Sequence, residues 1–245
     1  MSMSKNKVLE GIEAKGLALW IKKDKTLIIA DLHLGIEEMH NKQGTMLPRF
    51  NFKEIKKHLE EKVFPDVKAE LIVINGDLKH EFGSISQQEW SEVIDILRLL
   101  QTKCKRIVLI RGNHDTILGP IAKWENITIE KEGILLPKSN TFVTHGEKIP
   151  KSKEFASAKT IVIGHEHPAI TIREKYKEET FKAFLVGKWK DKNLIVQPSM
   201  NQVTTGTNIQ EEQILSPFLG QDLGKFKVFP VADRTYDFGY LEELE

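Results

Sequence analysis

The chain has 245 residues and a single cysteine, Cys104. One thiol excludes an internal disulfide and a metal site built from several thiolates. Its position just before a β-type run is typical of a structural residue rather than of a nucleophile. The chain also lacks any apolar stretch near the ~20 residues that a bilayer-spanning helix needs, and residues 1–8 are polar with no signal-peptide core after them. We therefore expect a cytoplasmic protein with no membrane partner.

A strong net charge is absent as well. The 36 Lys and Arg residues nearly balance the 35 Asp and Glu residues, which leaves a formal charge of +1. Such a balance does not mark a general binder of nucleic acid or of anionic membranes, so the class of partner has to be inferred from local sites. We find no repeat and no low-complexity linker, and the length suits one domain over residues 1–245.

The first half alternates buried strand patterns with amphipathic helix patterns. Predicted strands lie at residues 17–21, 26–30, 71–74 and 106–110. The first two form an opening hairpin. Predicted helices lie at residues 52–63 and 86–101, and Ser86 and Glu89 have the spacing of a capping box. Because strands joined by helical crossovers are parallel, we expect the residues that follow the strands ending at 30, 74 and 110 to share one sheet edge.

The second half is rich in short β-type runs and has no long helical pattern. Its predicted strands lie at residues 127–129, 134–136, 141–144, 160–163, 169–173, 181–186, 194–197 and 226–230. A parallel βαβαβ unit followed by many short strands predicts an α/β fold, called α+β in some schemes. In this fold two mixed β-sheets pack face to face and are flanked by helices.

Five of the predicted strands are followed at once by polar residues that can bind metals or transfer protons. These stretches are Asp31 to His33, Asn75 to His80, Arg111 to Asp115, His145 to Gly146, and Gly164 to His167. In Asp31-Leu32-His33 and His165-Glu166-His167, an extended backbone would direct both outer side chains to one point and the middle one away. Six of the eight histidines lie in these stretches, which would be an odd accident if all six were structural.

Together with Asp31, Asp77 and Asn113, these histidines supply more nitrogen and oxygen ligands than one ion needs. They are enough for two ions that share a bridging ligand. Taken alone, Gly112 to Asp115 could equally be a polar turn with a satisfied histidine. The five stretches together favour a two-metal hydrolytic centre.

The order Asp-x-His, Gly-Asp, Gly-Asn-His-Asp, His-Gly, Gly-His-x-His resembles the calcineurin-like metallophosphoesterase superfamily, and all five motifs occur between residues 31 and 167. The residues after Pro198, including Gly206 and Thr207, resemble small archaeal and bacterial phosphoesterases of that superfamily. The resemblance implies the same sandwich of two sheets. It implies one ion held by Asp31, His33, Asp77 and His167, and another held by Asp77, Asn113, His145 and His165. Asp77 would then be the bridge.

The resemblance also implies roles in catalysis. His114 would face the substrate, where it stabilises developing charge or protonates the leaving oxygen, and Asp115 would lie behind it to orient the imidazole. The stretch after Asp77 lacks the Asp-Arg pair of protein Ser/Thr phosphatases and is more similar to SbcD-type nucleases, which implies that His80 contacts the phosphate. A surface or supporting His80 is the alternative. The chain is too short for the DNA-capping domain of those nucleases.

We therefore expect a phosphoester hydrolase in which hydroxide bound to two divalent ions attacks phosphorus. Imidazole and carboxylate ligands suit Mn²⁺, with Fe²⁺, Zn²⁺, Ni²⁺ and Mg²⁺ as alternatives. A phosphodiester in a nucleotide or nucleic acid is the favoured substrate, and Lys148, Lys151 and Lys153 could line a phosphate path. A phosphomonoesterase for a small metabolite is the alternative, and a non-catalytic binding module is less favoured. The sequence leaves the oligomeric state open.

Overall fold

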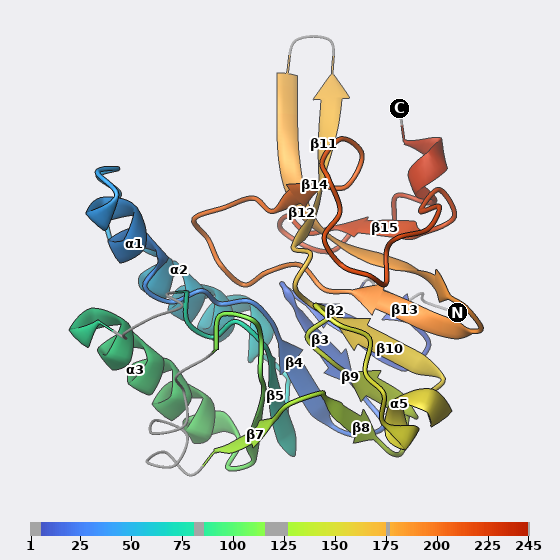
Figure 1. Ribbon diagram of the computed structural model, residues 1–245, viewed down its shortest axis with the longest axis horizontal. Helices are drawn as coiled ribbons and strands as arrows, with labels where there is room; N and C mark the ends of the chain where they lie inside the picture. Colours follow the sequence, from blue (N-terminus) through green and yellow to red (C-terminus); the bar gives the residue numbers. More distant parts are fainter. Residues whose placement is uncertain (1–5, 81–85, 116–126, 175–176, 245) are drawn as a thin grey trace.

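The computed structural model describes residues 6–80, 86–115, 127–174 and 177–244. Over these residues the chain forms two β-sheets packed face to face, as the sequence predicts (Figure 1). The first sheet has seven described strands in the order β1-β2-β3-β4-β5-β6-β7. The second has eight, with β14-β11-β12-β13-β10-β9-β8 in order and β15 paired to β12.

The first sheet begins as an antiparallel meander and continues as a parallel unit. Its strands are β1 (Lys7–Leu9), β2 (Ile12–Lys15), β3 (Ala18–Ile21), β4 (Thr26–Ile29), β5 (Leu71–Asn75), β6 (Ile107–Ile110) and β7 (Thr128–Glu130). The pairs β4-β5, β5-β6 and β6-β7 are parallel, which confirms the predicted βαβαβ unit. The strands β1 and β2 were not expected, because they are short and interrupted by charged residues.

Helices connect the parallel strands of the first sheet and cover its outer face (Figure 1). They are α1 (Ile36–Lys42), α2 (Asn51–His58), a π-helical turn η1 (Leu59–Val63) and α3 (Gln87–Lys103). Ser86 caps α3, because its Oγ accepts the Glu89 N–H at 3.1 Å. The other half of the predicted capping box is replaced by a different contact, in which the Glu89 carboxylate accepts the N–H of His80 at 3.1 Å.

The second sheet is assembled from the strand-rich half of the chain. Its strands are β8 (Ile134–Leu136), β9 (Thr141–Val143), β10 (Thr160–Ile163), β11 (Pro168–Glu174), β12 (Lys177–Trp189), β13 (Lys192–Val196), β14 (Thr207–Asn208) and β15 (Lys227–Pro230). The short helix α5 (Lys153–Ser157) and a 3-10 turn η2 (Leu241–Glu243) accompany them. The paired outer ends of β11 and β12 project from the body of the protein (Figure 1).

The apolar alternation along the strands divides the core into layers. Val73 is paired with Ile28 on one side and Val108 on the other, and all three pack between the sheets. Ile74 and its neighbours on the opposite face pack against the helices, and the outer face of the second sheet packs against α5 and the C-terminal segment. Each buried aliphatic side chain contributes roughly 1.5–3 kcal/mol. This packing fixes the strand ends that carry the polar stretches.

Within the described residues, no helix combines the length and the apolar character that crossing a lipid bilayer requires. The single domain over residues 1–245 stays a prediction.

Candidate metal centre

The polar residues that follow β4, β5, β6, β9 and β10 meet at the carboxyl ends of these strands, as the parallel pairing predicts. Within the described part of the chain, two mixed groups of side chains have ligand atoms within 4.8 Å of one another. They are Asp31, His33 and His167, and Asp77, His145 and His165. A third group consists of His33, His80 and His114. Clusters of imidazole and carboxylate could hold divalent metal ions.

The backbone reaches this geometry in a way that the sequence reasoning did not expect. Asp31, His33, Asp77, His165 and His167 all have a left-handed φ, between 46° and 64°. The extended backbone predicted for the two i, i+2 pairs is therefore wrong. Asp31 and His33 still join one group of ligands, whereas His165 and His167 belong to different groups. Residues other than glycine rarely adopt such φ values, and these backbone conformations persist only where surrounding contacts hold them.

Long-range backbone hydrogen bonds provide those contacts. The Asp31 N–H donates to the Gly76 carbonyl at 3.1 Å, and the His33 N–H donates to the Asp77 carbonyl at 2.9 Å. The N–H of Asn201, from the segment after β13, donates to the Asp31 carbonyl at 3.1 Å. The turns after β4 and β5 thus hold each other, and the segment after β13 holds the turn after β4.

Asp77 lies at the middle of the cluster and is 2% exposed. Its Oδ1 accepts the His114 N–H at 2.9 Å. Its Oδ2 lies 3.7 Å from His33 Nε2 and 3.4 Å from His145 Nε2, so one oxygen faces both groups of ligands. The carboxylate needs a glycine beside it, because a Cβ on Gly112 would lie 2.1 Å from Oδ1. Burial opposes charge on Asp77, but its hydrogen bond to His145 keeps the pKa of this carboxyl below the usual value.

His145 is oriented by its other ring nitrogen. Its Nδ1–H donates to the Asn75 carbonyl at 3.2 Å, which turns Nε2 towards Asn113 Oδ1 at 3.1 Å and Asp77 Oδ2. Burial opposes a charge here, yet Asp77 and Asp31 raise the pKa of His145 to about 9. The space between His145 and the two carboxylates therefore favours a positive charge, which a proton or a metal ion can supply.

Asp31 provides a second test of whether a cation fits. Its Oδ2 accepts the His165 N–H at 3.1 Å, but its buried Oδ1 has no hydrogen-bond donor among the described residues. This oxygen lies 3.4 Å from His167 Nε2, which in turn lies 3.3 Å from His33 Nε2. A buried carboxylate oxygen without a donor, beside two imidazole nitrogens, suits a metal ion.

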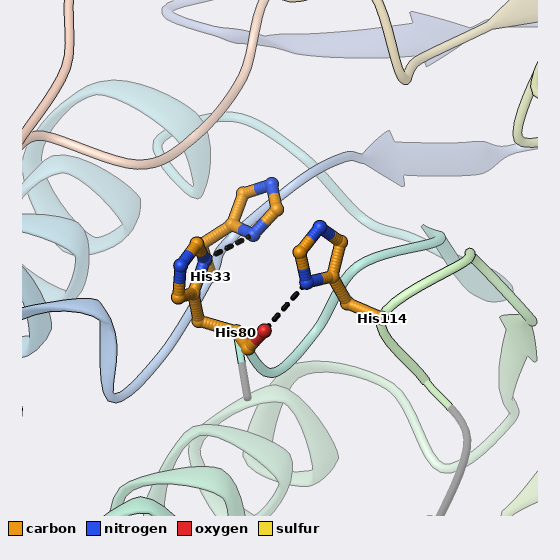
Figure 2. A group of neighbouring side chains, drawn as sticks. All are labelled: His33, His80 and His114. Carbon is orange, nitrogen blue, oxygen red and sulfur yellow. Dashed lines mark hydrogen bonds between the residues drawn. The ribbon is translucent and has the colours of Figure 1, made fainter. Parts of the chain in front are cut away.

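His80 and His114 lie beside His33 at the edge of the cluster, with their rings facing one another (Figure 2). The Nδ1 atoms of His33 and His80 share a hydrogen bond of 3.1 Å, and His114 Nδ1–H donates to the His80 carbonyl. Burial and the neighbouring His114 lower the pKa of His80 to about 4. Burial and His167 lower the pKa of His33 well below its usual value. Both rings are therefore neutral near pH 7.

Asp115 does not orient the His114 imidazole, which corrects the sequence-based expectation. Its Oδ1 accepts the Leu78 N–H at 3.0 Å and its Oδ2 accepts the Gly112 N–H at 3.0 Å. The reason is geometric, since in this turn the carboxylate folds back onto the backbone amides around Asp77. Burial and the charge of Asp77 raise the pKa of Asp115 to about 7. The His80 carbonyl holds the His114 ring instead.

The structure also reveals supporting residues that the sequence reasoning missed. The Asn51 side chain donates to the carbonyls of Leu32 and His33, at 3.3 Å each. Glu166 points away from its histidine neighbours, as predicted, and its Oε2 accepts the N–H groups of Leu215 and Ser216. Asn51 begins a helix and Glu166 is one of many acidic residues, so neither carried a signal in the sequence.

A cavity of about 330 Å³ adjoins the cluster at His145. We call it the basic cavity, because four basic side chains line it against two carboxylates, Glu132 and Glu147, of which Glu147 pairs with Lys148 at 3.2 Å. Lys148 and Lys151 line it, as the sequence suggested. Arg111 and Lys131 line it too, and they were missed because they come from other turns. Lys153 is the first residue of α5 and does not belong to the lining.

The two sheets and the His/Asp clusters are those of a metal-dependent phosphoesterase. The model of the family described as calcineurin-like phosphoesterase matches residues 25–195. The chain belongs to this family, whose members hydrolyse phosphoesters with divalent metal ions.

Comparison with solved structures finds a nuclease that shares the fold and a phosphoesterase with a weaker likeness. Nuclease MPE from Pseudomonas putida is 18% identical, with a TM-score of 0.64, and the match covers 93% of this chain and 94% of that one. The E. coli phosphoesterase Yfce is 17% identical, with a TM-score of 0.42, and the match covers 88% of this chain and 97% of that one. A comparison with curated proteins finds no match.

Proposed function

We propose that the protein is a dinuclear phosphodiesterase that acts on a nucleotide or nucleic acid. The observation that carries the proposal is the position of Asp77 Oδ2 between His33 Nε2, at 3.7 Å, and His145 Nε2, at 3.4 Å. A carboxylate oxygen that faces two separate groups of ligands is what a bridge between two ions requires. The cytoplasmic location expected from the sequence stays a prediction.

The proposed ligands divide into two sets that share Asp77. The first set is Asp31, His33, Asp77 and His167, and the second is Asp77, Asn113, His145 and His165. The mixture of imidazole, carboxylate and amide oxygen favours Mn²⁺ over softer ions. Two such ions, when bound, supply Lewis acidity that polarises the phosphate and lowers the pKa of a water molecule.

The chain supplies the proton donor. His114 Nδ1–H donates to the His80 carbonyl, and we assign His114 Nε2 the role of giving a proton to the leaving oxygen. His80 keeps His33 in place through the hydrogen bond between their Nδ1 atoms and presents its Nε2 to the phosphate. We assign Asp115 a positioning role, because its carboxylate accepts the N–H groups of Leu78 and Gly112, two residues next to Asp77.

The basic cavity supports a diester substrate. A diester has a second substituent that needs a binding surface, and Arg111, Lys131, Lys148 and Lys151 provide one next to His145. Lysine and arginine beside a phosphodiester centre suit the flanking phosphates of a nucleotide chain. The fold that the chain shares with a nuclease agrees with this substrate class.

The decisive experiment compares kcat/KM for a matched aryl phosphodiester and aryl phosphomonoester with Mn²⁺. The proposal predicts a higher value for the diester. Preference for the monoester would favour the phosphatase for a small metabolite, and inertness of the metal-loaded protein towards both esters would favour a binding module.

The nucleic-acid part of the proposal is tested through the cavity. Replacing both Lys148 and Lys151 by Ala should lower oligonucleotide hydrolysis and reduce the slope of its salt dependence by about one for each lost phosphate contact. Hydrolysis of the aryl diester should not change. Lys153→Ala is the matched control, because Lys153 lies outside the cavity. Equal losses on both substrates would contradict a role in binding flanking phosphates.

A further inference from the structure

A second cavity, of about 320 Å³, lies between α2, β12 and the segment 202–205. None of the proposed metal ligands lines it. Its polar lining consists of His58, Thr180, Lys182, Gln202, Thr204 and Thr205. Within the described part of the chain no Asp or Glu contributes to this lining, so the ammonium group of Lys182 faces no acidic wall.

Lys182 is the charged group of this cavity. The residue is mostly buried, and its Nζ donates to Ser199 Oγ at 3.0 Å. It forms no ion pair with any residue that the structure describes. Burial lowers the pKa of Lys182 to about 7, and the more distant charge of Asp31 offsets only part of this effect. A buried ammonium group without a contacting carboxylate is costly, and an anion in the cavity would remove that cost.

The remaining lining suits a small oxyanion. His58 is neutral, because its Nε2 accepts the Leu17 N–H at 3.0 Å and because burial and the charge of Lys62 lower its pKa to about 4. Thr204 Oγ1 accepts the side-chain amide of Asn201 at 3.3 Å, which leaves its hydroxyl hydrogen free to donate. The volume is at the lower end of the range of small-molecule sites. One cation with nearby hydroxyl donors matches a single phosphate group rather than a polyanion.

We propose that this cavity binds the phosphate group of a small molecule, with Lys182 as its counter-charge and the hydroxyls of Thr204 and Thr205 as hydrogen-bond donors. The occupant is inorganic phosphate or a nucleoside monophosphate, which share the same recognition chemistry. The site is separate from the metal centre and does not depend on the function proposed for that centre.

Competitive acylation of lysine amines in the metal-loaded protein, read by mass spectrometry, tests the proposal without a change in sequence. Inorganic phosphate should protect Lys182 and leave Lys188, an exposed lysine on the same strand, unchanged. Protection should persist in Asp77→Asn, which separates this site from phosphate bound at the metal centre. Unchanged labelling of Lys182 at saturating phosphate would overturn the proposal. If adenosine monophosphate protects at lower concentration than phosphate, the occupant is a nucleotide, and equal concentrations indicate free phosphate.

A pair of variants provides the second test. Calorimetry measures phosphate binding to the Asp77→Asn variant and to the double variant that also carries Lys182→Met. The double variant should bind phosphate at least about tenfold more weakly, the usual cost of losing a charged hydrogen bond. Lys188→Met is the control and should not alter binding. Circular dichroism spectra that match the parent protein show that the variants fold. Equal phosphate affinity of folded Lys182→Met and Lys188→Met would refute the site.

Discussion

Replacing Glu166 by alanine should destabilise the protein and loosen the metal centre together. Glu166 is 1% exposed, and its Oε2 accepts the N–H groups of Leu215 at 3.0 Å and Ser216 at 2.8 Å. Ser216 Oγ donates in turn to the Gly146 carbonyl at 2.8 Å. The C-terminal segment is thus fastened to the turns that carry His145, His165 and His167.

The variant leaves the N–H groups of Leu215 and Ser216 without this acceptor. Leu215 is exposed, so water can hydrate its N–H, and the cost comes mainly from the buried N–H of Ser216. Each buried N–H without a partner costs about 1–3 kcal/mol. Burial also raises the pKa of Glu166, which means that the native carboxylate itself carries a desolvation cost that the variant removes. We therefore expect Glu166→Ala to lose about 1–3 kcal/mol of the free energy of unfolding. Metal affinity should fall by about 10- to 100-fold, as for other residues that support metal ligands.

Urea denaturation and Mn²⁺ titration measure the two effects. Glu166→Gln is the control, because it keeps a side-chain oxygen for both N–H groups, and it should lose less than about 1 kcal/mol. A loss below about 1 kcal/mol in Glu166→Ala, or equal losses in both variants, would refute the reasoning.

Three further predictions concern the metal centre and His58, which lines the second cavity. His114→Ala should keep its metals by elemental analysis but lose about 10² to 10⁴ in kcat, and a missing ion would make His114 a ligand. Asp77→Asn should lose both ions and nearly all turnover, whereas full occupancy with undiminished activity would exclude the bridge. The pKa of His58 is about 4 in the folded protein, against an ordinary value of 6.5. Between these two pH values His58 is therefore protonated in the unfolded chain and neutral in the folded one. Its stability contribution is therefore complete above about pH 6.5 and falls as the pH drops towards 4. Urea denaturation should show that about 2 kcal/mol of the loss between pH 7.5 and pH 5 is absent in His58→Gln, and equal pH dependence of the two proteins would contradict this.

The sequence by itself determined the strands, the helices and the polar turns that follow them. The apolar run from Leu71 to Ile74 predicts a buried strand, and the spacing of apolar residues in α3 predicts a helix with one buried face. Both patterns depend only on residues close together in the sequence. The parallel order of β4, β5 and β6 follows from the helices between them, so the meeting of Asp31, Asp77 and Asn113 at one edge was predictable too.

Tertiary structure alone decided how those residues are held. A left-handed φ at Asp31 or His167 is locally unfavourable, and only contacts with distant segments, such as the Asn201 N–H on the Asp31 carbonyl, stabilise it. The same holds for Asp115, whose carboxylate has several amides within reach, and for Arg111 and Lys131, which join Lys148 at one cavity. Which of these contacts forms depends on how the two sheets pack, because local propensity does not distinguish partners that are far apart in the chain.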